Sequence, residues 1–231
     1  MKSKISVILF LIATSFLHSQ SDFKILSSDF KSITIEYSPI YSDTSLVKYE
    51  NSEYQNIDLY LGGIKNFDNW GSPSIVVRKI NVGVPSEFGN TIEVLSSSYK
   101  EISGSIVPVP KPVQDTLSVT YEYKKNTEYF SYKSDDELIS FEDYGLVRGV
   151  GSQTISINPV KFDAAQNRIK LYSKIIFKIN FSSNSVLSNK PADDLIDGAI
   201  VNYDVAKYWN HDLENKKLNK VVIANSVLAT G

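Results

Sequence analysis

The sequence predicts an all-β protein, an antiparallel β-sandwich or jelly-roll-like domain with a C-terminal extension. Two observations predict this fold. Short segments in which apolar and polar residues alternate recur along residues 21–185, with turn-forming residues between them, and no sustained helical period precedes Pro191. Successive side chains on a strand point to opposite faces of a sheet, so such segments are typical of half-buried antiparallel strands. Their near-regular spacing favours a sandwich.

The clearest predicted strand pair lies within residues 147–181. Apolar side chains form one run in Ile155–Phe162 and a second, largely alternating run in Ile169–Phe181. The polar segment Asp163–Asn167 between them can turn the chain. Pro159 lacks a backbone donor, so we expect it at a bulge or a sheet edge. The segment therefore predicts an antiparallel hairpin that covers an apolar core.

The remaining strands follow the same pattern. They are predicted at residues 33–37, 57–61, 74–84, 91–95, 101–107 and 117–123. The polar segment Ser38–Glu53 is predicted to be a loop, and Asn69–Pro73 a turn. Prolines at 108, 110 and 112 predict an extended, rigid surface loop, because proline fixes φ and removes a hydrogen-bond donor.

The first residues indicate export. Lys2 and Lys4 precede the apolar run Ile5–Leu17, which is too short for the roughly 20 helical residues that span a bilayer. Ser19 offers a small residue for cleavage. We therefore predict a signal peptide at residues 1–19 and an exported product, in the periplasm, at the outer-membrane surface or secreted.

The C-terminal part differs in composition from the β-domain at residues 21–185. Ser182–Pro191 is polar and reads as a linker, whereas the final run Lys220–Gly231 is apolar and has no partner strand in view. We therefore interpret residues 186–231 as a linker and the start of a following, truncated domain.

Composition excludes several functions. The chain contains no cysteine, which excludes disulfides, thiolate metal sites and a cysteine nucleophile within it. Without Lys2 and Lys4, 22 of the 24 basic side chains remain, against 26 acidic ones. This balance gives no reason to expect nucleic acid or an anionic membrane as a partner. No second apolar stretch approaches spanning length, and no cofactor or metal site is predicted.

Three groups of residues have an alternative chemical interpretation. His211 with Asp212 would supply part of a Ser-His-Asp arrangement, but this stretch is charged and typical of a solvated surface. Asp193–Gly198 is acidic enough for calcium but lacks the loop spacing, which favours an exposed turn or helix start. The tyrosine-rich segment 121–132 could stack on sugars, and cross-strand packing explains it equally well.

Two passages resemble a known family. Gly71–Ile75, which leads into Val84-Pro85, resembles the glycine-x-proline turn at the start of gingipain-type (C25) cysteine peptidase pro-regions. Arg148-Gly149, followed by Ile155–Phe162 and Leu171-Tyr172, is similar to the closing hairpin of those pro-regions.

The resemblance extends to the end of the chain, with one departure. The tail Val221–Gly231 is similar to the segment after the pro-region in type IX secretion sortases of the PorU kind. Val76 stands where the family pattern often has a second proline.

The resemblance implies an exported pro-domain that acts as an intramolecular chaperone and latency inhibitor of a cysteine endopeptidase. The peptidase domain would follow in cis, downstream of Gly231, and would carry the catalytic cysteine and histidine. By itself the chain would not be an enzyme.

In such families a basic side chain on a pro-domain loop can occupy the specificity pocket of the peptidase. A charge-assisted hydrogen bond of this kind stabilises by about 1.5–3 kcal/mol. The candidates are Lys124 and Lys125, at a predicted hairpin tip, and Arg148, next to Gly149, which lets the backbone approach a partner closely. Alternatively, the lysines are solvated loop charges, and Arg148 pairs with Glu142 or Asp143.

A function from another class remains open. A secreted β-sandwich binding module, for carbohydrate or cell-surface attachment, would have the same strand pattern. An independent hydrolase is disfavoured, because cysteine is missing and His211 is the single histidine after the signal peptide. A peptidase sequence beyond Gly231 would distinguish the pro-region from the binding module.

Overall fold

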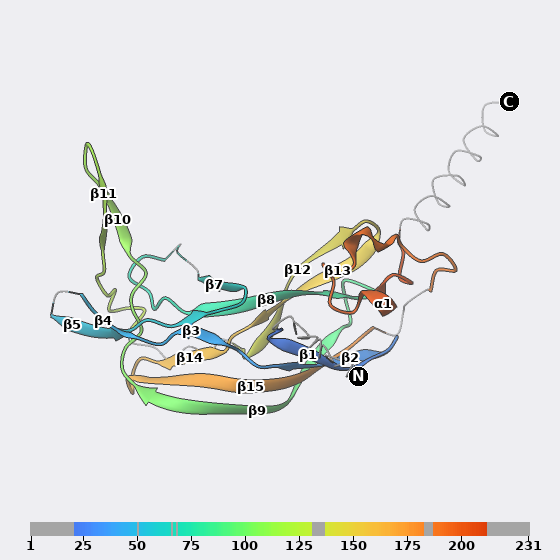
Figure 1. The fold of residues 1–231 in the computed structure, drawn as a ribbon, viewed down its shortest axis with the longest axis horizontal. Coiled ribbons are helices and arrows are strands. Elements are labelled where there is room, and N and C mark those ends of the chain that lie inside the picture. The colour runs from blue at the N-terminus through green and yellow to red at the C-terminus, as the bar shows by residue number, and fades with distance from the viewer. Residues whose placement is uncertain are drawn as a thin grey trace, which may run out of the picture.

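A computed structural model shows the fold (Figure 1). It describes residues 21–49, 51–65, 67, 69–130, 137–182 and 187–211. The predicted signal peptide, Asp212 and the tail resembling the PorU segment lie outside the described residues. Among the described residues, no helix is long and apolar enough to cross a membrane.

The first of two main sheets is organised around the longest strands. It contains β1 (Phe23–Ser28), β2 (Ser32–Tyr37), β9 (Thr91–Ser103), β14 (Val160–Asp163) and β15 (Arg168–Asn180). Strand β9 pairs with β15 along the whole length of β15. The other edge of β15 is shared, since β14 pairs with its first residues and β2 with its last. All these pairings are antiparallel.

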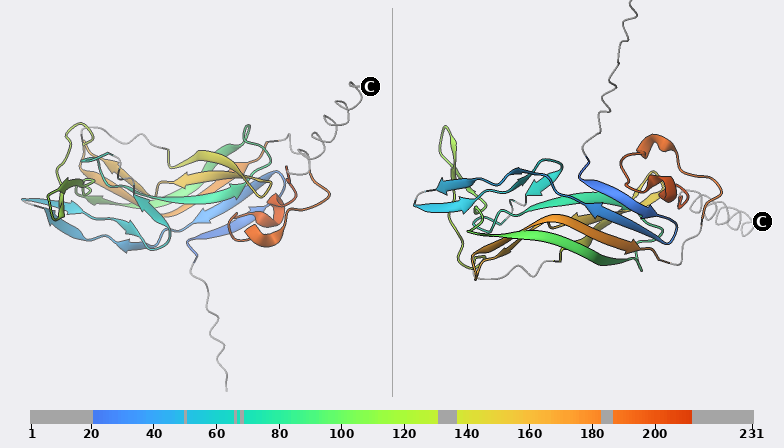
Figure 2. Two further views of the ribbon diagram at one scale, coloured as in Figure 1. Left: turned by 90° about the horizontal axis from the view of Figure 1, so that it is seen from above. Right: turned by 60° about the horizontal axis from the view of Figure 1, so that its bottom comes forward.

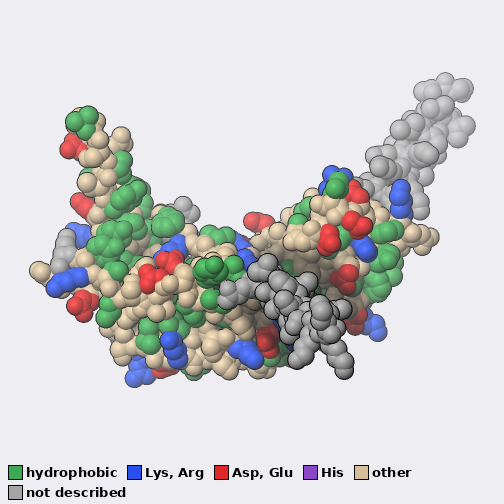
Figure 3. Space-filling view, in the orientation of Figure 1, with side chains coloured by type: hydrophobic (Ala, Val, Ile, Leu, Met, Phe, Trp, Pro, Cys, Tyr) green, Lys and Arg blue, Asp and Glu red, His purple; other side chains and the backbone are tan. Residues whose placement is uncertain are grey.

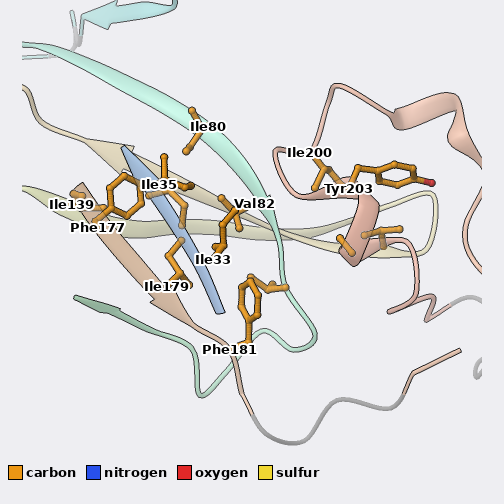
Figure 4. Close-up of a cluster of buried hydrophobic side chains, with 14 of the residues drawn as sticks. Ile33, Ile35, Ile80, Val82, Ile139, Phe177, Ile179, Phe181, Ile200 and Tyr203 are labelled. Atoms are coloured by element: carbon orange, nitrogen blue, oxygen red, sulfur yellow. The ribbon is translucent and has the colours of Figure 1, made fainter. Parts of the chain in front are cut away.

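The second sheet packs over the first (Figure 2). It contains β7 (Gly63–Lys65), β8 (Val76–Gly83), β12 (Ile139–Val147) and β13 (Val150–Ile157), in the order β12-β13-β8-β7. Two clusters of buried apolar side chains lie between the layers. Figure 4 shows part of the larger cluster, where Ile33, Ile35 and Phe177 of the first sheet lie with Ile80 and Val82 of the second. The predicted sandwich-like, all-β fold is confirmed.

The hairpin predicted within residues 147–181 is confirmed only in its second half. Asp163 pairs with Arg168, so the turn between β14 and β15 lies where the sequence predicts it. The run Ile155–Phe162, however, is divided between the two sheets. The chain crosses from one sheet to the other at Asn158-Pro159, where the proline has no ladder hydrogen bond to lose.

The predicted loop at residues 38–53 is wrong. This region and the residues after it form β3 (Tyr41–Asp43), β4 (Leu46–Tyr49), β5 (Ser52–Gln55) and β6 (Asp58–Leu59), which pair as β3-β6 and β4-β5. Contacts with distant residues explain the difference. The hydroxyl group of Tyr41 donates to the carbonyl groups of Pro159 and Tyr172, and Tyr49 stacks on Tyr123.

Residues 187–211, here called the C-terminal lobe, pack on the sandwich. The lobe contains a 3₁₀ turn, η1 (Asp194–Ile196), and one short helix, α1 (Tyr203–Ala206). The side chain of Asn202 is fully buried, accepts from the Gly83 N–H at 2.7 Å and donates to the Gly83 carbonyl at 3.0 Å. Ala206 and Trp209 belong to the larger core cluster, so the core extends beyond the predicted boundary at residue 185.

Candidate functional site: a projecting hairpin arm

The feature that stands out from the sandwich is a two-stranded hairpin. Strands β10 (Lys111–Gln114) and β11 (Val119–Glu122) pair antiparallel and project away from the sheets (Figure 1). We call residues 111–122 the arm, and residues 115–118 its tip. Leu117 at the tip is 99% exposed, and Val119 and Tyr121 are more than half exposed. Such apolar exposure on a projecting element is typical of an interaction surface.

The arm is attached to the sandwich through the turn at Gly71. The Gly71 N–H donates to the Val109 carbonyl, before β10, and the Gly71 carbonyl accepts from the Asn126 N–H, after β11. Gly71 has φ +80°, and a Cβ atom there would lie 2.8 Å from both the Asn126 nitrogen and the Lys124 carbonyl oxygen. Only glycine combines this backbone conformation with so close an approach. The Gly71–Ile75 motif therefore forms the base of the arm.

Two aromatic rings lie beside the exposed Lys125 at this base. The Lys125 Nζ lies 5.0 Å from the centroid of the Tyr54 ring and 4.9 Å from that of the Phe130 ring. Both distances are within the range of cation–π attraction. Burial lowers the pKa of the Lys125 ammonium group. The structure thus gives Lys125 a packing role within the domain.

The prediction of a hairpin tip at Lys124-Lys125 was wrong, because residues 115–118 form the tip. Strand β11 ends at Glu122, which pairs with Lys111 at the bottom of the arm, so both lysines follow the arm. Lys124 is exposed, and within the described ranges no carboxylate forms an ion pair with it. Among the described residues, Lys124 is therefore an exposed cation without an ion-pair partner, and it lies near the base of the arm rather than at the tip.

Arg148 lies in a different part of the molecule. It forms, with Gly149, the two-residue turn between β12 and β13, and its φ is +49°. Its Nε lies 3.1 and 3.0 Å from the two carboxylate oxygens of Asp193 in the C-terminal lobe. The partner is thus neither Glu142 nor Asp143; Glu142 pairs with Lys79. The ion pair joins the turn to the lobe.

The other sequence candidates have local roles. The Asp193 carboxylate accepts from the Leu195 N–H and caps η1, so the acidic segment is a helix start. The Arg148 guanidinium holds the pKa of Asp193 below its usual value. The backbone N–H of His211 donates to the Gly149 carbonyl, while Asp212, its expected side-chain partner, lies outside the described residues. Across the described ranges, no three His, Cys, Asp or Glu side chains are grouped to hold a metal ion.

The tyrosines proposed to stack on sugars are partly used within the domain. The ring of Tyr123 stacks on that of Tyr49, with centroids 3.7 Å apart and planes 10° from parallel. One face of Tyr123 is therefore covered by the protein. Tyr121, on the arm, and Tyr129 remain exposed.

The arm and the C-terminal lobe rise at opposite ends of the same side of the molecule. Figure 3 shows a hollow between them, and in Figure 1 strands β7 and β8 lie between the two ends. Sequence reasoning placed Leu117 on a strand and missed the tip. The available signal was the polar run Asp115-Thr116 before Leu117-Ser118, which interrupts the alternation between two short strands.

Comparisons with known proteins agree on one family. The Propeptide_C25 family model matches residues 14–208. A structure described as the complex of Porphyromonas gingivalis RgpB pro- and mature domains has a TM-score of 0.65 at 16% identity, covering 79% of this chain and 98% of that chain. A structure concerning the zymogenic latency of gingipain K from Porphyromonas gingivalis has a TM-score of 0.53 at 19% identity, covering 69% and 92%. A search of curated proteins finds no match.

At these identities the solved structures show a shared fold, whereas the family model covers most of the sequence. The chain belongs to the Propeptide_C25 family, the pro-regions of gingipain-like cysteine peptidase precursors.

Proposed function

We propose that this pro-region holds a C25-type cysteine peptidase domain, encoded downstream of Gly231, in a latent state and assists its folding. The family assignment supports a pro-region that is not itself catalytic, and the chain has no cysteine to act as nucleophile. The RgpB structure contains pro- and mature domains together, and the gingipain K structure concerns zymogenic latency. A pro-domain that contacts the peptidase of its own precursor accounts for both.

The single observation that carries this proposal is the arm above the hollow. Leu117, Val119 and Tyr121 are exposed on a hairpin whose two strands, within the described residues, pair with each other and with no strand of the main sheets. Apolar side chains held out on a hairpin stabilise the domain little, but they gain free energy when a partner covers them. We assign the hollow and the arm to the peptidase domain.

We also propose that the precursor is exported. The predicted signal peptide supports delivery of the precursor across the inner membrane, and the similarity of Val221–Gly231 to PorU-type precursors supports a role in type IX secretion. The periplasm, the outer-membrane surface and the medium are all compatible with this route.

The test is a shortened arm in the intact precursor. Residues 113–120 are replaced by Asn-Gly, which leaves the paired Pro112 and Tyr121 to close a two-residue turn. We expect the shortened precursor to hydrolyse peptide substrates about tenfold faster than the wild-type precursor before any pro-region is cleaved, since anchors at the centre of an interface dominate its affinity.

The matched control is Phe88→Ser, which removes an exposed apolar side chain from the segment between β8 and β9. This variant should remain latent. A shortened precursor that is as latent as the wild type would contradict the proposed function.

A further inference from the structure

One side chain of the arm, that of Leu117, is almost completely exposed to solvent. Leu117 is 99% exposed, the highest value among the large apolar side chains of the described residues. It lies at the tip, where the Asp115 N–H donates to the Ser118 carbonyl and closes the turn. The backbone on both sides is therefore held, while the isobutyl group meets only solvent. A side chain presented in this way is suited to enter a cleft.

The charges of the arm make its entry into an acidic pocket unfavourable. The arm contains one basic residue, Lys111, and two acidic residues, Asp115 and Glu122. The Lys111 Nζ lies at the base, 5.8 Å from the centroid of the Trp70 ring. The tip thus carries a carboxylate and no cation, and like charges across an interface are unfavourable.

The basic candidates are held elsewhere. The Lys125 ammonium group lies over the rings of Tyr54 and Phe130, at the base of the arm, and Arg148 is bound to Asp193. Lys124 is exposed, but its backbone carbonyl lies at the base of the arm, next to Gly71. To reach the same cleft as the tip, Lys124 would have to extend along the whole arm.

The place where the described chain ends bears on the partner. The last described residue, His211, is hydrogen-bonded to Gly149 at the β12–β13 turn, and this turn and the C-terminal lobe flank the hollow opposite the arm (Figures 1 and 3). A domain that follows the lobe can therefore occupy the hollow, and the arm would then lie against it.

We propose that Leu117 is the side chain that this pro-region inserts into the specificity pocket of the peptidase, and that this pocket is apolar. The inference rests on the proposed function and adds the substrate class: peptides with an apolar residue before the scissile bond. Burial of a leucine in such a pocket corresponds to about a tenfold to hundredfold gain in affinity.

The experiment has two parts. The first measures the latency of the intact precursor, and the second measures the specificity of the mature peptidase released from it. Latency is measured for Leu117→Asp, Leu117→Met and Lys124→Ala. The mature enzyme is assayed on peptides that differ only in having Leu, Met, Arg or Lys before the scissile bond. We expect Leu117→Asp to lose latency by about tenfold or more, and Leu117→Met and Lys124→Ala to keep it. We also expect kcat/KM to be at least about tenfold higher for Leu than for Arg or Lys.

The outcomes separate this inference from the proposed function. If Lys124→Ala loses latency while Leu117→Asp keeps it, or if Arg or Lys peptides are preferred, the inference is overturned. If the shortened arm releases activity but Leu117→Asp does not, the inference fails and the proposed function stands. If the shortened arm also stays latent, both fail. Unchanged thermal unfolding of Leu117→Asp shows that the fold is intact, as the exposure of this side chain leads us to expect.

Discussion

At the scale of single residues, the functional geometry depends on positions that make unusual backbone contacts. Gly71 holds both sides of the arm because its N–H and carbonyl bind residues before β10 and after β11. The sequence marked Gly71 as part of a turn motif. It did not show what the turn supports, since Val109 and Asn126 are distant in sequence and meet Gly71 only in the folded chain.

We predict that Gly71→Ala releases the arm from its base. The Cβ atom would lie 2.8 Å from two backbone atoms, at a φ that costs an L-residue about 1–2 kcal/mol. Limited proteolysis should cut the arm faster in this variant. Gly198→Ala is the control, because Gly198 has φ +87° but nothing within 4 Å of its Cβ position. Equal cleavage of the arm in the two variants would contradict the role of Gly71 in holding it.

The Arg148–Asp193 pair predicts a pH dependence. The Arg148 hydrogen bonds lower the pKa of Asp193 below 3.8 in the folded state. The ion pair therefore stabilises the folded protein fully at pH values above the pKa of the unfolded state. This stabilisation is lost as the pH falls through the lower pKa of the folded state. The difference in unfolding free energy between the wild type and Asp193→Asn should be constant above about pH 5 and should shrink below pH 3.8. A difference that persists at the lowest pH would exclude the ion pair as its cause.

At the scale of elements, the arm has little part in the stability of the domain. In the part of the chain that the structure describes, its strands pair only with each other, and no side chain of the tip belongs to either core cluster. We therefore expect the shortened arm to change the free energy of unfolding by less than about 0.5 kcal/mol, as for exposed substitutions generally, when measured by urea denaturation. A loss of several kcal/mol would show that the arm is needed for folding.

The elements also show where sequence reasoning reaches its limit. Alternation located β2, β8 and β15, whose inward side chains form the core. It failed for β3 to β5, where short strands depend on tyrosine contacts with residues far along the chain. It also misplaced the tip at Lys124-Lys125, because the alternation that begins at Leu117 continues to Tyr123, past the end of β11 at Glu122.

At the scale of the whole molecule, the C-terminal lobe is joined to the sandwich by a buried polar contact. Asn202 satisfies both backbone groups of Gly83, and a Cβ atom on Gly83 would lie 2.2 Å from the Ala206 Cβ. The sequence showed a change of composition near residue 186, which favoured a separate unit. Composition cannot show that Ala206 and Trp209 complete the core of the preceding sheets.

We predict that Asn202→Ala lowers the free energy of unfolding by about 2–4 kcal/mol, because two buried backbone groups lose their partner. Gln166→Ala, in the exposed turn between β14 and β15, should change it by less than about 0.5 kcal/mol. Urea denaturation measures both. Equal, small effects would show that the lobe contributes little to the stability of the sandwich.

The proposed function requires the arm to contact a peptidase domain of the same precursor. The most direct measurement places a photo-crosslinking phenylalanine analogue at position 117 of the intact precursor and identifies the joined peptides by mass spectrometry. We expect crosslinks from position 117 to the substrate cleft of the peptidase domain, and none from the same analogue at position 88. Crosslinks confined to the pro-region, or to the peptidase surface away from its cleft, would contradict it.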